Sequence, residues 1–174
     1  DVGSVDAGYF GIRNDGATGD INVSAAGTIR ILNNGEIIRG PGLVTVTTGV
    51  DLITSGANPT TPNYQTAVAS FNGSIVLNLG RDGIFGLSNG DGDLFNDFGD
   101  IRAAFDVTIT AGRDVIVNEN TYVDAGMSTI SGNMVITTGR DIRILQTNTR
   151  DSRIATTGGT ITLTTGPGGE FELN

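Results

Sequence analysis

A short pattern that recurs six times along the 174 residues constrains this chain more than any other feature. Each copy has two large apolar residues that lie five and three positions before a small anchor residue. Alternation with a period of two places such residues on one face of a short β-strand. The anchor is Ala26 in the first copy and glycine in the other five, at Gly49, Gly80, Gly112, Gly139 and Gly166.

Charged residues follow several of these anchors in the same order. Three copies continue as Gly-Arg-Asp, and a fourth copy keeps only the aspartate. The arginines are Arg81, Arg113 and Arg140, and the aspartates are Asp51, Asp82, Asp114 and Asp141. Successive anchors are 23, 31, 32, 27 and 27 residues apart, a spacing that suits one coil of a solenoid with about three strands.

The repeat predicts an all-β parallel β-helix of about six coils in one domain, 1–174. Stacked coils give each strand a partner above and below and join the apolar faces into one interior column. The anchor glycine serves a bend where a Cβ would clash or where φ must be positive. Residues 1–18 are expected to form an incomplete first coil, with loop insertions near 54–72, 86–104 and 119–131. The alternative is an antiparallel sandwich, which does not explain why the tripeptide recurs in register.

Composition excludes several kinds of chemistry. The chain has no His, Cys or Trp and no Lys, so a Ser-His-Asp triad, a zinc ribbon and a Schiff-base lysine are impossible. The formal charge of −9 argues against nucleic acid and anionic membranes as partners. No apolar run reaches the ~20 residues that a membrane-spanning helix needs. The chain begins with Asp and shows no signal peptide, which indicates a mature product or a fragment of a longer chain.

The segments 106–115 and 133–142 resemble the repeats of filamentous-haemagglutinin-type bacterial exoproteins, and the resemblance extends over residues 19–173. It implies a right-handed parallel β-helix from a secreted or cell-surface protein, of a kind commonly exported by a two-partner system. Such proteins act in adhesion, aggregation or contact-dependent competition, so the expected partners are glycans or proteins on host or neighbouring cells. The chain has no recognisable secretion domain and no toxin domain, so the export route and an effector activity are not inferred.

An Asp-rich segment suggests a calcium loop. Oxygen-bearing side chains occupy positions 1, 3, 5, 9 and 12 of a twelve-residue stretch, the ligand spacing of an EF-hand. They are Asn89, Asp91, Asp93, Asp97 and Asp100. Leu94 stands where that loop has Gly, and Asp100 replaces the usual Glu. The alternative is a solvated acidic loop whose side chains cap turns; no other cofactor is expected.

The arginine column has two interpretations. It could grip sulfated or carboxylated glycans, or it could be neutralised by the neighbouring aspartates in an Arg–Asp lattice, which we favour. Thr-x-Thr units at 45–47, 108–110 and 162–164 are similar to the outward arrays of ice-binding β-helices. Val76, Asn78 and Val135 interrupt that array, and threonine is in any case a good strand former.

Taken together, these patterns predict a non-enzymatic stalk or adhesin segment with contact loops at 54–72 and 86–104. Neither end shows a capping helix, and open strand edges can pair further. A self-assembling extracellular fibre is therefore the first alternative. A polysaccharide-active β-helix enzyme is a second, because scattered Asp residues could act as paired carboxylates. Tyr64 and Tyr122, expected in loops, could touch a sugar.

Overall fold

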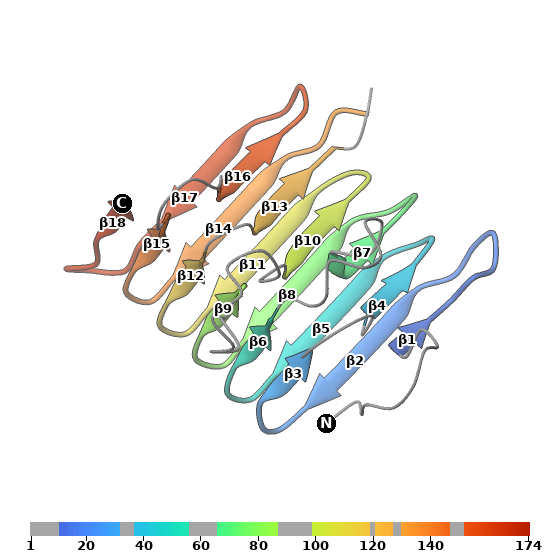
Figure 1. Ribbon diagram of the computed structural model, residues 1–174, viewed down its shortest axis with the longest axis horizontal. Helices are drawn as coiled ribbons and strands as arrows, with labels where there is room; N and C mark the ends of the chain where they lie inside the picture. The colour runs from blue at the N-terminus through green and yellow to red at the C-terminus, as the bar shows by residue number, and fades with distance from the viewer. Residues whose placement is uncertain are drawn as a thin grey trace.

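The chain folds as an all-β parallel solenoid (Figure 1). The computed structural model describes residues 11–31, 37–55, 66–86, 99–118, 121–126, 130–146 and 152–174. Its strands form three six-stranded sheets, and every pairing is parallel. The parallel β-helix prediction is confirmed, and the antiparallel alternative is wrong. In the described part of the chain, no helix has the length and apolar character needed to cross a membrane.

Each sheet takes one strand from each turn of the chain. Sheet A contains β1 (Gly11–Arg13), β4 (Ile37–Gly40), β7 (Thr66–Ser70), β10 (Asp100–Ala103), β13 (Tyr122–Ala125) and β16 (Arg153–Thr156). Sheet B contains β2 (Ile21–Ala25), β5 (Val44–Thr48), β8 (Ile75–Leu79), β11 (Val107–Ala111), β14 (Met134–Thr138) and β17 (Ile161–Thr164). Sheet C contains β3 (Ile29–Ile31), β6 (Leu52–Thr54), β9 (Gly83–Phe85), β12 (Val115–Val117), β15 (Ile142–Ile144) and β18 (Phe171–Leu173). About four turns, from β4 to β15, have a paired neighbour on each side.

The six repeated segments of the sequence become sheet B. Val44 pairs with Ile75, Ile75 with Val107 and Val107 with Met134, without a shift in register. A one-residue slip would turn the apolar side chains outward, so the alternating pattern itself fixes the register.

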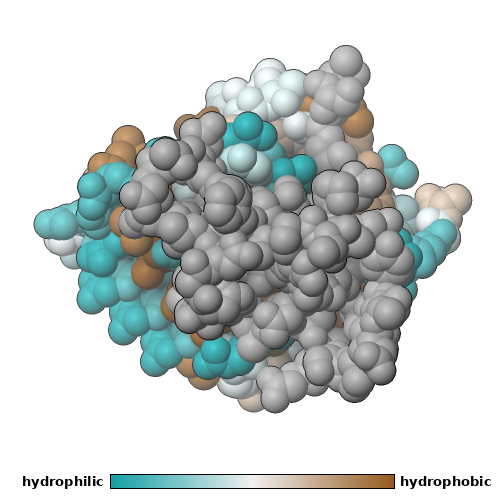
Figure 2. All heavy atoms as spheres, viewed as in Figure 1, coloured by the Kyte–Doolittle hydropathy of each residue, from teal (hydrophilic) through white to brown (hydrophobic). Residues whose placement is uncertain are grey.

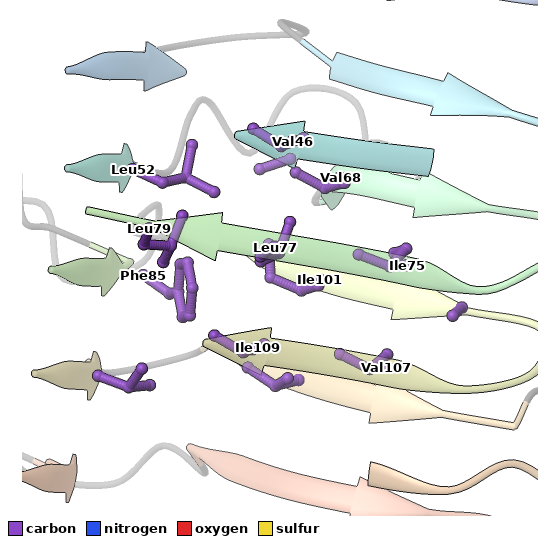
Figure 3. Close-up of a cluster of buried hydrophobic side chains, with 14 of the residues drawn as sticks. Val46, Leu52, Val68, Ile75, Leu77, Leu79, Phe85, Ile101, Val107 and Ile109 are labelled. Atoms are coloured by element: carbon purple, nitrogen blue, oxygen red, sulfur yellow. The ribbon is translucent and has the colours of Figure 1, made fainter. Parts of the chain in front are cut away.

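The core is a continuous column between the three sheets. Figure 3 shows Leu77 of sheet B, Ile101 of sheet A and Phe85 of sheet C pointing into the same interior. All three side chains are fully buried. At about 25 cal/mol per Å² of apolar surface, this shared column is the main source of stability, because no single turn could bury it alone.

The expected insertions contain the strands of sheet A. β7 lies inside 54–72, β10 inside 86–104 and β13 inside 119–131, while β1 lies inside the first 18 residues and pairs with β4. Most segments outside the described residues fall between sheet C and sheet A or at the start of the chain, while residues 127–129 fall between sheet A and sheet B. In the two longest coils, the extra length lies in the C-to-A connections after β6 and β9.

The last turn is less covered than the others. Ile161 is 44%, Phe171 47% and Leu173 68% exposed. One turn earlier, Met134 pairs with Ile161 and Ile142 pairs with Phe171, and both of these partners are fully buried. Among the described strands, none pairs with the outer edges of β16, β17 and β18. This end therefore combines exposed apolar side chains with three strands that can accept a further partner.

Candidate functional site

The anchor glycines stack in one file at the corner between sheets B and C. The amides of Gly80, Gly112 and Gly139 donate to carbonyl oxygens of the preceding turn, at 2.9–3.0 Å. A Cβ at Gly112 would overlap the carbonyl oxygen of Gly80, and Gly49, Gly139 and Gly166 meet the preceding anchor in the same way. None of these glycines is among those with positive φ. Close approach of consecutive turns, and not a left-handed conformation, requires glycine here.

The Gly-Arg-Asp turns carry ion pairs that run from turn to turn. Arg81 donates from Nε (2.9 Å) and Nη2 (2.6 Å) to the two carboxylate oxygens of Asp51. Arg113 binds Asp82, and Arg140 binds Asp114, in the same bidentate way. We call these three contacts the inter-turn ion pairs. Each arginine therefore grips the aspartate one turn earlier, so the column is neutralised across the turns.

The same aspartates also fix the backbone. Oδ1 of Asp51 accepts the amide of Asp82, Oδ1 of Asp82 accepts that of Asp114, and Oδ1 of Asp114 accepts that of Asp141, each at 3.2 Å. All four carboxylates are buried, while the arginines remain about half exposed. Figure 2 shows hydrophilic residues along the edge of the molecule where Figure 1 places the turns between sheets B and C. In the Arg–Asp lattice predicted from the sequence, the carboxylates are therefore buried and the guanidinium groups are partly exposed.

Hydrogen bonding controls the charge of these carboxylates. The bidentate hydrogen bonds from Arg81 lower the pKa of Asp51, and they outweigh burial, which acts in the opposite direction. At Asp114 burial raises the pKa, but the hydrogen bonds from Arg140 and from the Asp141 amide reverse the sign, and the net pKa is lowered. Both groups are therefore anionic at neutral pH.

The series changes at the last turn. Gly169 stands one turn above Arg140 and Glu170 above Asp141, so the position equivalent to the other arginines is a glycine in the turn after Asp141. Instead Arg143 of the same turn donates to the Asp141 carboxylate at 2.8 Å. The Glu170 amide donates to Oδ1 of Asp141 at 3.0 Å, so the backbone contact continues where the ion pair does not.

The calcium prediction rests almost wholly outside the described residues. Only Asp100 of the five predicted ligands is described, and it lies fully buried in β10. Oδ1 accepts the amide of Tyr122 at 2.8 Å, and Nη2 of Arg102 lies 2.7 Å from Oδ2. The described ranges contain no group of three or more acidic side chains arranged to hold a metal ion. A melting temperature that rises with calcium and falls with chelator would support the site, and an unchanged one would end it.

A second charged cluster lies on sheet A and was not predicted from the sequence. Arg153 donates to both carboxylate oxygens of Asp124, at 3.0 and 2.9 Å. The guanidinium carbons of Arg102 and Arg153 lie 5.4 and 4.4 Å from the ring centre of Tyr122. A solvent-open hollow of about 290 Å³ lies beside this cluster and is lined also by Thr156.

This cluster corrects one expectation about the aromatic residues. Tyr122 lies in strand β13 and not in a loop, and arginines from the turns before and after it cover its ring. Tyr64 lies outside the described residues. The only sequence signal was the spacing of Arg102, Asp124 and Arg153, which becomes visible once the strands of sheet A are aligned.

Comparisons with protein families, with characterised proteins and with solved structures found no match to this chain.

Proposed function

We propose that this chain is a non-enzymatic structural and adhesive segment of a bacterial secreted or cell-surface protein. In this proposal it is a right-handed β-helical rod of six coils that carries contact loops. The observation that carries the proposal is the set of inter-turn ion pairs, which repeat one contact along the axis. The right hand is supported by the strong preference of parallel crossover connections for it.

The repeated contacts suit a part that resists deformation. Strand pairing in three sheets joins each inner turn to its neighbours, and Arg81, Arg113 and Arg140 add a bidentate contact at one corner. The carboxylates of Asp51, Asp82 and Asp114 accept hydrogen bonds from backbone amides of the following turn. Because their oxygens are used in these structural contacts, a mechanical role is favoured over general acid or base chemistry.

Adhesion is assigned to the two longest C-to-A connections, within 54–72 and 86–104. We expect fluorescent beads coated with the chain to bind glycans or proteins on cell surfaces. Replacing residues 56–65 or 87–98 by Gly-Ser linkers of equal length should abolish binding, while replacing 147–151 in the same way should not. Equal binding by all three variants would remove the contact role from these loops.

The enzymatic alternative is tested separately. Incubation with acidic polysaccharides should release no reducing ends above a buffer control. Release that disappears in Asp91→Ala or Asp93→Ala would overturn the non-enzymatic proposal.

A self-assembling fibre is the second candidate, and the exposed end of the solenoid favours it. Ile161, Phe171 and Leu173 would become buried if another copy added its strands to β16, β17 and β18. Such an end-to-end contact does not close on itself and gives filaments. Electron micrographs of the purified chain should then show filaments that lengthen with concentration and that Leu173→Lys shortens. Monodisperse particles at every concentration would reject the fibre.

A further inference from the structure

The outer face of sheet B carries two straight columns of small, uncharged side chains. The first column is Asn22, Thr45, Val76, Thr108, Val135 and Thr162, and the second is Ser24, Thr47, Asn78, Thr110, Thr137 and Thr164. We call these twelve residues the threonine face. All of them are half-buried or exposed, while the alternate residues point into the core.

The columns are regular because the pairing of sheet B is regular. Its five strand pairs show no register shift, and Figure 1 shows the six strands side by side in similar directions. The side chains of one strand are therefore about 6.6 Å apart along it, and the strands are about 4.8 Å apart. A two-dimensional lattice of small side chains results, and seven of the twelve are threonines that carry a hydroxyl and a methyl group.

The two valines in the first column preserve the side-chain shape of threonine. Val76 and Val135 have the branched shape of threonine and alternate with Thr45, Thr108 and Thr162 in the first column. Branching at Cβ restricts χ1, so the methyl and hydroxyl groups are held in fixed positions. A rigid surface loses little conformational entropy when it binds. At these two positions the interruption removes a hydroxyl group and keeps the branched shape, whereas Asn78 in the second column replaces threonine by an unbranched amide side chain.

The chemistry of the face restricts what can bind to it. The chain has a formal charge of −9, but none of the twelve residues is charged, so the face offers no ion pair to a charged polymer. None of them is aromatic, so it offers no ring on which sugars could stack. What remains is an uncharged partner with a repeat in two dimensions, whose surface accepts and donates hydrogen bonds at short, equal intervals.

We propose that the threonine face binds the surface of ice. Its hydroxyl groups take the places of water oxygens at the crystal surface, and its methyl groups order water between them. This binding is independent of the adhesive loops, which connect sheet C to sheet A in the chain and are not part of sheet B, so either proposal can fail while the other stands.

The test uses the whole chain and ice itself. The wild-type protein should separate the freezing from the melting point of a seeded crystal, facet the crystal and slow recrystallisation. Thr110→Tyr and Thr137→Tyr place a ring on the inner strands β11 and β14 and should lose most of this effect. Thr157→Tyr is the matched control, because Thr157 is exposed in a turn outside sheet B, and it should keep the effect.

Circular dichroism and melting temperature establish that each variant is folded. A wild-type protein without freezing gap or faceting overturns the proposal, and so does an equal loss in Thr157→Tyr. The threonine face could instead bind a second copy of the chain, and this outcome must be distinguished from ice binding. If sedimentation velocity shows a dimer that Thr110→Tyr dissociates, while crystals grow as in buffer, the face is an interface between copies and not an ice-binding surface.

Discussion

At the scale of single residues, the Gly-Arg-Asp tripeptide divides one task among three side chains. Glycine lets two turns approach, arginine reaches back to the preceding turn, and aspartate receives the arginine and the amide of the following turn. The order matters because Gly112, Arg113 and Asp114 each face a different neighbour. A change at any one position should therefore affect the contact between turns and not only its own surroundings.

Glycine at the anchor is required by space. Gly112→Ala places a Cβ against the Gly80 carbonyl oxygen, and such overpacking should lower the free energy of unfolding by about 1–3 kcal/mol. A Cβ at Gly27 would have no neighbouring atom within 4 Å, so Gly27→Ala should be neutral or stabilise the protein by up to about 1 kcal/mol. Urea unfolding measures both. Equal effects at the two positions would contradict the close-approach explanation.

The buried carboxylate of Asp114 should matter more than an exposed one. Asp114→Ala leaves the Asp141 amide and the Arg140 guanidinium without their acceptor, and a loss of about 1–3 kcal/mol in unfolding free energy follows from unsatisfied polar groups. Asp15 also contacts two arginines, Arg13 and Arg39, but its side chain is 60% exposed. Asp15→Ala is the control and should change stability little. An equally large effect of Asp15→Ala would show that exposed ion pairs contribute as much to stability as the buried carboxylate of Asp114.

At the scale of elements, the pairing of β7 with β10 is irregular, whereas the other pairings of the described strands show no register shift. Asp100 pairs with Thr66 and Ile101 with Val68, so the extra residue is Ala67 of β7, as in a β-bulge, which can re-aim a side chain. Asp100 is the residue at the shift, and its carboxyl group is fully buried. Burial raises the pKa of Asp100 to about 7, although the nearby Arg102 acts in the opposite direction.

This raised pKa predicts a pH dependence with a definite sign. The unfolded pKa of Asp is about 3.9, so between pH 4 and 7 the folded protein binds more protons than the unfolded chain. The free energy of unfolding should therefore fall as pH rises from about 4 to about 7 and level off above that. Asp51 and Asp114 have lowered pKa values, and their contribution is lost only as pH falls below about 4.

Urea unfolding at a series of pH values separates the two effects. Asp100→Asn should remove the decline between pH 4 and 7 and leave the loss of stability in acid. Asp15→Asn, on the exposed surface, should keep that decline. A wild-type stability that is constant from pH 4 to 8 would show that Asp100 titrates normally.

At the scale of the whole molecule, the solenoid is close to one-dimensional. Each turn contacts only its neighbours, so stability is a sum of turn and interface contributions. The inner turns have two interfaces, the first and last turns have one each, and the last turn also has exposed apolar residues such as Leu173 at its surface. Unfolding should therefore begin at that end.

Hydrogen exchange followed by mass spectrometry tests this order. Amides of β8 and β11, which are paired on both sides, should exchange most slowly, and those of β17 and β18 most rapidly. Leu173→Lys should leave the inner strands unchanged. A single exchange rate for all strands would mean that the rod unfolds as one cooperative unit.

The sequence by itself determined the parallel stack, because a strand pattern that repeats with its anchor in register has only one way to bury its apolar faces. It also brought together the glycines, arginines and aspartates of the tripeptide. Only the tertiary structure decided that each arginine reaches back by one turn, because sequence order does not say which neighbour a side chain bonds. The cluster of Arg102, Tyr122 and Arg153 and the buried state of Asp100 were likewise settled by the structure. Those residues lie in unequally spaced coils, and their contacts arise only when the strands of sheet A come into register.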